Sequence, residues 1–171
     1  MPLSTWVIPP PKKTLVVGVA EMVASNDPGA ELLTYSLGSC LGIAVYDPVK
    51  KVGGLLHIML PDSSIDPAKA ASLPFMFVDT GVPRLFQAVY NLGGDRRTLV
   101  VKVAGGAQFL DPKGVFNIGE RNFTALTNLL ARHGLSPHAQ DVGGVRSRTL
   151  RMELGSGNIT IKSPGIDSYP L

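Results

Sequence analysis

Short apolar runs bounded by turn-forming residues constrain the fold of this chain more than any other feature. The runs are rich in Val, Leu and Ile, and Gly, Pro, Asp or Asn stands at their ends. Segments of this length and composition are typical of β-strands. In the N-terminal part of the chain they cover residues 15–19, 32–35, 42–46 and 52–60. The turn signal Asp47-Pro48 separates the last two runs, so we predict that they form a hairpin or at least two adjacent strands.

Two later segments have the periodicity of helices. Residues 79–92 and residues 117–133 repeat apolar side chains at helical spacing, and each segment is followed by glycine. In the second segment, Asn117 and Glu120 have the spacing of a capping box, which predicts that the Asn117 side chain caps the helix. Residues 62–74 are polar and are predicted to form a loop.

Further strand signals complete the chain and indicate its fold class. Residues 98–104 have the pattern of a buried strand, and residues 145–154 and 158–162 have the pattern of a second hairpin. The order strands, helix, strand, helix, strands predicts an α+β or a layered α/β fold. A chain of 171 residues fits one domain. We place that domain at residues 14–171, behind a proline-rich N-terminal tail at residues 1–13.

Charge and cysteine content argue against several classes of protein. The 16 basic and 13 acidic residues leave a net charge of only +3 without a dense Lys/Arg block, so we predict no nucleic-acid partner. A single cysteine excludes an internal disulfide and favours a reducing compartment. The N-terminus lacks the pattern of a secretory signal, and Glu21 interrupts the apolar run that follows it. We therefore predict a cytoplasmic protein without membrane insertion.

The one cysteine, Cys40, lies in a turn of small residues, and His57 lies in the next apolar run. An imidazole beside a thiol can accept its proton and later return that proton to a leaving group. If the chain folds back between residues 47 and 51, the two side chains meet at one edge of the sheet. Main-chain N–H groups around Gly38 and Ser39 can stabilise an oxyanion in such a turn. The pattern is compatible with a cysteine hydrolase.

The residues alone leave other interpretations open. A lone cysteine in an apolar run is often a small buried hydrophobic residue, and a histidine in a strand is more often structural than catalytic. A metal site is disfavoured because His57, His133 and His138 lack ligand spacing with Cys40. A papain-type protease has its histidine far downstream of the cysteine, whereas here the separation is 57 − 40 = 17 residues.

Several short motifs follow one another in a distinctive order. They are TYSLGSC at 34–40, YDP at 46–48, GGLLHIMLP at 53–61, VDT at 78–80, KVAGGA at 102–107, NIGERN at 117–122 and DVGG at 141–144. Together they resemble the CheD family of chemoreceptor glutamine deamidases, over residues 15–162. The chain departs from the family pattern in its long proline-rich start and at Tyr35-Ser36.

The resemblance implies a reaction, a fold and a set of site residues. The reaction is hydrolysis of selected glutamine side chains on chemoreceptors to glutamates, with release of ammonia, through a Cys-His thioester mechanism that needs no metal or organic cofactor. The fold is a layered α/β sandwich of mixed sheets with flanking helices, similar to bacterial toxin deamidases. By position, Cys40 matches the nucleophile, His57 the base and Thr34 the third member. Ser39 and Gly38 are candidates for oxyanion and substrate binding.

The resemblance also implies two kinds of protein partner. One is the cytoplasmic domain of a chemoreceptor, and the other is a CheC-type phosphatase of the response regulator. The chain could instead be a non-catalytic binding module that engages and regulates such a phosphatase. Phe109, Leu110 and Phe116 are apolar residues in a turn-rich segment, and we predict that they form a partner-binding surface, with burial in the core as the alternative.

Overall fold

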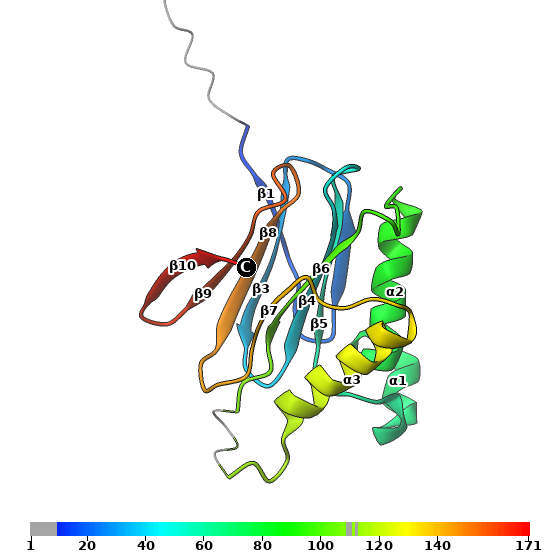
Figure 1. Ribbon diagram of the computed structural model, residues 1–171, viewed down its shortest axis with the longest axis vertical. Helices are drawn as coiled ribbons and strands as arrows, with labels where there is room; N and C mark the ends of the chain where they lie inside the picture. Colours follow the sequence, from blue (N-terminus) through cyan, green and yellow to red (C-terminus); the bar gives the residue numbers. More distant parts are fainter. Residues whose placement is uncertain (1–9, 109–110, 112) are drawn as a thin grey trace, which may run out of the picture.

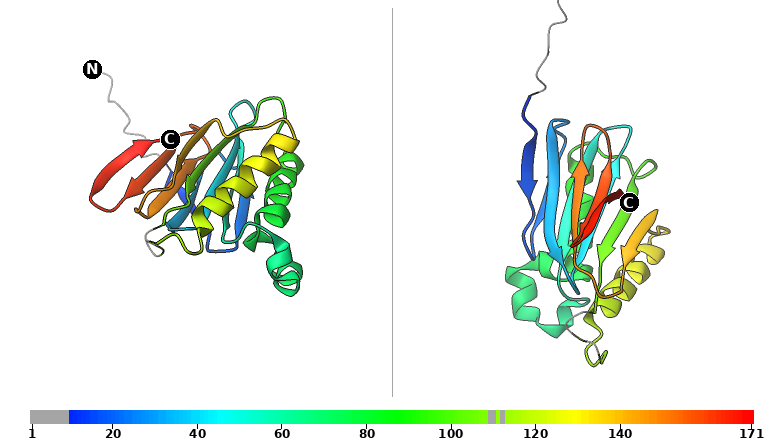
Figure 2. Two further views of the ribbon diagram at one scale, coloured as in Figure 1. Left: turned by 60° about the horizontal axis from the view of Figure 1, so that its bottom comes forward. Right: turned by 90° about the vertical axis from the view of Figure 1, so that its left-hand side faces the viewer.

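The computed structural model describes residues 10–108, 111 and 113–171, and these residues form three layers (Figure 1). Two sheets pack face to face, and helices cover the outer face of the second sheet (Figure 2). The first sheet has the order β1 (Lys13–Val16), β3 (Ala30–Leu37), β8 (Arg148–Glu153), β9 (Ile159–Ser163) and β10 (Ile166–Pro170). The second has the order β2 (Met22–Ser25), β5 (Val52–Ile58), β4 (Leu41–Asp47), β6 (Val100–Gly105) and β7 (Ala139–Val142). Each sheet mixes parallel and antiparallel pairs, which confirms the predicted layered α/β sandwich of mixed sheets.

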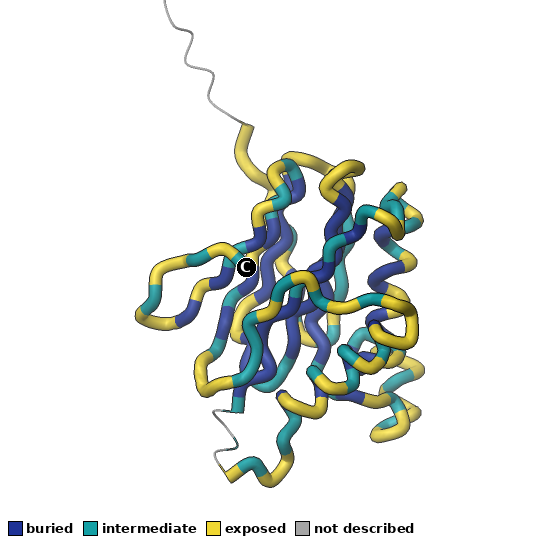
Figure 3. Tube along the Cα trace, viewed as in Figure 1, coloured by how far each residue is buried: buried dark blue, intermediate teal, exposed yellow. Residues whose placement is uncertain are grey.

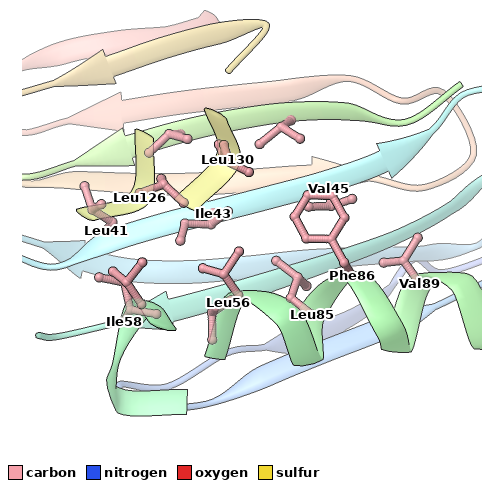
Figure 4. Packing of buried hydrophobic residues seen from close by; sticks show 14 of the residues in the cluster. Leu41, Ile43, Val45, Leu56, Ile58, Leu85, Phe86, Val89, Leu126 and Leu130 are labelled. Carbon is pink, nitrogen blue, oxygen red and sulfur yellow. The ribbon is translucent and has the colours of Figure 1, made fainter. Parts of the chain in front are cut away.

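The helices of the described residues lie on one side of the sandwich. They are α1 (Pro67–Ser72), α2 (Val78–Asn91) and α3 (Ile118–Arg132), with single 3₁₀ turns at Ser63–Ile65 and Pro74–Met76. The apolar faces of α2 and α3 pack on the second sheet (Figure 4). In the described part of the chain, no helix combines the length and the hydropathy needed to cross a membrane.

Strand β4 shows how the sequence divides its side chains between two cores. The strand lies between β5 and β6, and all of its residues are buried. Ile43 and Val45 point to the helices, whereas Ala44 and Tyr46 point to the first sheet. Successive side chains of a strand point to opposite faces, so a continuous apolar run is expected where both faces are covered. Buried residues accordingly follow the two sheets, and exposed residues gather in the loops (Figure 3).

The predicted hairpins and helices are confirmed. β4 and β5 pair antiparallel from the Leu41–Ile58 pair to the Asp47–Val52 pair, which is the hairpin expected from residues 42–46 and 52–60. β8 and β9 form the second predicted hairpin. The segments with helical periodicity became α2 and α3. The sequence analysis did not anticipate β2, β7 or β10, which are short strands at or near sheet edges.

The prediction of a loop at residues 62–74 is wrong, because this segment contains α1. The Asp66 carboxylate accepts a hydrogen bond from the Lys69 N–H at 3.0 Å, and Pro67 occupies the first turn. Both are signals of a helix start. The polar composition hid them, since no residue of α1 is buried and the helix has no apolar stripe to detect.

The predicted capping box of α3 is also wrong. Asn117 has a left-handed backbone with φ of 48°, and its side chain makes no capping hydrogen bond. Its Oδ1 instead accepts a hydrogen bond from the Gln108 amide at 3.0 Å. The Asp111 carboxylate accepts hydrogen bonds from the main-chain N–H groups of three residues in the preceding loop, which are Val115, Phe116 and Asn117. The start of α3 is therefore fixed by a carboxylate in the preceding loop and not by the Asn117 side chain.

Most of the predicted N-terminal tail, residues 1–13, lies outside the described residues, which begin at residue 10. Lys12 forms an ion pair with Glu153, and Lys13 already pairs with Ala30 in β1. The division into a tail and a single domain at residues 14–171 stays a prediction.

Candidate active site

Cys40 lies in the turn between β3 and β4, at the end of the sandwich where β5 also ends (Figure 1). The register of the second sheet pairs Gly42 of β4 with His57 of β5. Cys40 stands two residues before Gly42, so the alternation of side chains places it on the same face as His57. Cys40 packs against the apolar cluster between the two sheets, in agreement with that placement. The thiol and the imidazole therefore belong to the same layer.

Thr34 reaches the imidazole from the opposite sheet. Its Oγ1 lies 2.8 Å from His57 Nδ1 and 2.8 Å from the main-chain oxygen of Val17. A carbonyl oxygen can only accept, so the single hydroxyl proton of Thr34 is donated to Val17. The hydroxyl oxygen then accepts from Nδ1, which must carry the ring proton. This arrangement leaves Nε2 of a neutral His57 with a free lone pair, as a proton acceptor.

His57 Nε2 is buried and has no hydrogen-bond partner among the described residues, Cys40 included. A buried polar atom without a partner is uncommon in folded proteins and calls for an explanation. Catalytic hydrogen bonds are often long or incomplete in the absence of substrate and form in the complex. In the resting protein, Nε2 is thus a hydrogen-bond acceptor without a donor among the described residues.

Burial controls the protonation of both groups. His57 is only 2% exposed, and this burial lowers the pKa of its imidazole to about 4. Burial also raises the pKa of the Cys40 thiol, which the Cys40 main-chain N–H partly offsets by stabilising the thiolate. At neutral pH both groups are therefore uncharged. The two groups therefore do not form a thiolate–imidazolium ion pair in the resting protein.

A bulge in β3 turns the side chains of Thr34 and Leu37 into the layer between the two sheets. The pairing of β3 with β8 shifts register between Thr34 and Leu37, and Ser36 has a left-handed φ of 56°. Tyr35 is exposed, whereas Thr34 and Leu37 are both fully buried. A bulge breaks the strict alternation of a strand, and bulges are common next to active sites. The insertion at Tyr35-Ser36 thus permits both flanking side chains to point inward.

Gly42, which faces His57 across the hairpin, makes room for this arrangement. A Cβ atom at Gly42 would lie 2.8 Å from Leu37 Cδ1 and 3.4 Å from Thr34 Cγ2. The first distance is shorter than packed carbon atoms tolerate. The glycine therefore leaves room for the Leu37 side chain beside Thr34 in the layer that contains the imidazole.

Gly38 and Ser39 lie in the same turn as Cys40, and Ser39 lines a cavity of about 170 Å³ with Gln108, Asp111 and Phe116. Phe116 also lines a wider groove of about 730 Å³ that runs along α3. Phe116 is 68% exposed, which excludes for this residue the alternative of burial in the core. Phe109 and Leu110 lie outside the described residues.

Sequence reasoning missed Asn122, which is fully buried on α3. Its amide nitrogen donates to the main-chain oxygen of Ser39 at 3.0 Å and to that of Met59 at 2.9 Å. A signal was present: Asn122 precedes Leu126 and Leu130 at four-residue steps, so a polar side chain stands in the buried stripe of the helix. A polar residue at a core position of this kind indicates a specific partner.

Comparison with known proteins gives consistent matches. The family described as CheD chemotactic sensory transduction matches residues 59–163, a segment that begins just after His57. A protein of Solibacter usitatus, named as a probable chemoreceptor glutamine deamidase CheD, is 46% identical over 161 residues, covering 91% of this chain and 95% of that protein.

Two further relatives match a similar share of the chain, which includes Cys40 and His57. A probable chemoreceptor glutamine deamidase CheD 1 of Syntrophus aciditrophicus is 44% identical over 151 residues, covering 88% of this chain and 94% of the relative. A probable chemoreceptor glutamine deamidase CheD of Desulforamulus reducens is 45% identical over 152 residues, covering 87% and 90%. Matches of this length leave only the ends of the chain outside, so they span the turn and the hairpin described above.

Proposed function

This chain belongs to the CheD family, and from that premise we propose that it hydrolyses glutamine side chains of chemoreceptors to glutamates and releases ammonia. The substrate in this proposal is the cytoplasmic domain of a receptor. The observation that supports it most is the imidazole of His57, which lies in the same layer as Cys40. Its Nδ1 is hydrogen-bonded to Thr34, and its Nε2 has no hydrogen-bond partner among the described residues. The proposed chemistry requires no metal or organic cofactor.

The first half of the proposed reaction forms a thioester. His57 Nε2 accepts the proton of the Cys40 thiol as the sulfur attacks the carboxamide carbon. The carbonyl oxygen becomes an oxyanion, and main-chain N–H groups around Ser39 and Cys40 stabilise it. Nε2 then donates its proton to the nitrogen, the C–N bond breaks, and ammonia leaves. The glutamine side chain is now joined to Cys40 through a C–S bond.

The second half returns the enzyme to its starting state. Water loses a proton to Nε2 and attacks the thioester carbon. The C–S bond breaks, the sulfur recovers the proton as a thiol, and a glutamate side chain is released. His57 cycles between neutral and protonated forms, and its low pKa makes the protonated ring a strong acid toward the leaving nitrogen. Thr34 keeps the ring proton on Nδ1 throughout, which is the role that we propose for it.

Mass spectrometry of a receptor fragment tests this function. Incubation with the wild-type protein is expected to raise the mass of the intact fragment by about 1 Da per modified glutamine, because NH₂ is replaced by OH, and to release one ammonia for each. Cleavage of the fragment would identify a cysteine protease instead. An unchanged fragment, across receptors of the same bacterium, would contradict the proposal.

A second function, binding of a CheC-type phosphatase, is favoured by the exposed apolar residues of the loop before α3. Val115 is 70% exposed and Phe116 is 68% exposed, and Phe116 borders the groove along α3. Exposed apolar patches of this kind often mark protein interfaces. The sequence prediction for this surface also included Phe109 and Leu110, which lie outside the described residues.

The variant Phe116→Asp tests this surface. A charge at an apolar contact is expected to weaken capture of the phosphatase by about tenfold or more, while Cys40→Ala binds like the wild type. A pull-down in which Phe116→Asp binds as well as the wild type would remove Phe116 from the interface. Loss of binding in Cys40→Ala as well would place the phosphatase on the catalytic turn.

A further inference from the structure

The turn that carries Cys40 has each of its carbonyl groups held by a donor. Ala107 N–H donates to Gly38 O at 2.8 Å, and Gly106 N–H donates to Cys40 O at 2.8 Å. The carbonyl between them, that of Ser39, accepts from the side-chain amide of Asn122 at 3.0 Å. Two of the donors are main-chain N–H groups. Asn122 is the only side chain of the three.

The hydrogen bond to Ser39 O determines where the next N–H points. Ser39 C=O and Cys40 N–H belong to one peptide group, and no cis peptide occurs in the described residues. In a trans peptide the C=O and the N–H point in opposite directions. Because Asn122 holds the oxygen on its own side, the Cys40 N–H points away from α3. Within the described residues no main-chain oxygen accepts a hydrogen bond from that N–H, and its one neighbouring acceptor is the sulfur of Cys40 itself.

The approach of α3 to the turn depends on Gly119. A Cβ atom at Gly119 would lie 2.3 Å from Gly106 O, so only glycine permits this contact between the first turn of α3 and the end of β6. Gly106 in turn donates to Cys40 O. The helix therefore comes close enough for Asn122, one turn later, to reach two carbonyl groups of other elements.

Asn122 holds both halves of the site at once. Its second amide hydrogen is donated to Met59 O at 2.9 Å, two residues after His57. Since both acceptors are carbonyl oxygens, both amide hydrogens are required and the orientation of the amide is settled. Asn122 Oδ1 is consequently left buried and without a hydrogen-bond partner among the described residues. An orphan buried oxygen lowers stability, so this residue is not explained by stability alone.

We propose that Asn122 is a positioning residue that orients the Ser39–Cys40 peptide so that the Cys40 N–H can stabilise the oxyanion. The inference rests on the proposed deamidase function and adds to it the residue that sets the direction of the Cys40 N–H. Asn122 does not touch the reacting atoms. It acts through the peptide group of Ser39 and Cys40 and keeps that turn against the end of β5.

The variant Asn122→Leu tests the inference, since leucine has a similar size and cannot donate. Loss of one oxyanion donor typically lowers kcat by about 100-fold or more, and we expect a fall of about 100-fold with KM changed by less than about threefold. Alkylation of Cys40 by iodoacetamide is the discriminating readout. This displacement forms no oxyanion, so its rate is expected to stay within about threefold of the wild-type rate.

The matched control is Asn91→Leu, on an exposed asparagine at the C-terminal end of α2, whose carbonyl accepts from Gln87. It is expected to leave kcat, KM and alkylation unchanged. If Asn122→Leu does not fold, as judged by thermal denaturation, Asn122→Ala replaces it, because a smaller side chain cannot overfill the site. The same expectations apply to that variant.

Each result decides between the alternatives. A kcat within about threefold of wild type in Asn122→Leu overturns the inference and leaves the proposed function standing. An equal loss of kcat and of alkylation rate also overturns it, since Asn122 would then support the thiol and not the N–H. A wild-type protein that alkylates normally but releases no ammonia shows instead that the proposed function has failed, and the inference falls with its premise.

Discussion

Cys40→Ser is expected to lower ammonia release from a receptor fragment by at least about 10⁴-fold, although the two side chains differ by one atom. The reason is the protonation state of the site. Burial lowers the pKa of His57 to about 4, so the ring is a weak base. It can assist the attack of a polarisable thiol, but it cannot activate a hydroxyl group whose proton is far harder to remove. Ammonia assays over hours and the mass of the fragment measure the effect.

The single cysteine supplies an independent control for this result. Since the chain has one thiol, alkylation at a stoichiometry of one reports on Cys40 alone. Loss of activity is expected to follow the extent of alkylation in direct proportion. Thermal denaturation should show that Cys40→Ser keeps its fold, because a small residue replaces one of similar size. Retention of more than about 1% of the wild-type rate by Cys40→Ser would exclude covalent catalysis through this sulfur.

His57→Gln is expected to have opposite effects on activity and on acid stability. Loss of a general base and acid typically lowers the rate by about 10²- to 10⁴-fold, and we expect the upper end because the same ring serves both halves of the reaction. In the wild type, kcat/KM is expected to hold from neutral pH down to an acid limb near pH 4, where the Nε2 lone pair becomes protonated. Steady-state assays across pH measure both the loss of rate in the variant and the acid limb of the wild type.

The stability effect has a definite sign. The pKa of His57 is about 4 in the folded protein and 6.5 in an unperturbed chain. Below pH 6.5 the unfolded chain therefore binds a proton that the native ring resists, and the free energy of unfolding falls as the pH drops toward 4. The shift corresponds to about 3 kcal/mol at pH 4. His57→Gln cannot titrate, so it should lose about 3 kcal/mol less than the wild type between pH 7 and pH 4.

Urea denaturation at pH 7 and pH 4 measures this difference. The comparison within each variant removes the effects of other acidic groups, which are common to both proteins. An identical pH dependence for the two proteins would show that the imidazole is not held in its neutral form by burial. The loss of activity in His57→Gln and its pH-dependent stability are therefore tested independently of each other.

The part of the site that sequence reasoning could reach is the part built by neighbouring segments. The β4–β5 hairpin follows from two apolar runs and the Asp47-Pro48 turn, and the register of a hairpin follows from its turn. Once that hairpin is assigned, Cys40 and His57 must lie near one end of it. The position of Thr34 came from the family resemblance, because its contact with His57 joins residues of different sheets.

What the sequence could not supply are contacts whose partners lie far apart along the chain. Val17 O accepts from Thr34, and Asn122 donates to Ser39 across a separation of 83 residues. No local pattern marks either acceptor, since every residue has a carbonyl group. The failed prediction for Asn117 has a related cause. The capping pattern was correct in spacing, but Asp111 and Gln108 bind the groups that capping would have used.

The hydrogen-bonded chain from Val17 through Thr34 to His57 crosses from one sheet to the other. This has a consequence for partly folded states of the protein. While the two sheets have not yet joined, nothing fixes the proton on Nδ1, and burial does not yet keep the ring uncharged. A half-assembled molecule in which only the β4–β5 hairpin has formed therefore has Cys40 near an imidazole whose tautomer is not yet fixed. In the proposed mechanism, newly made chains should react slowly with the glutamines of other proteins until the sandwich closes.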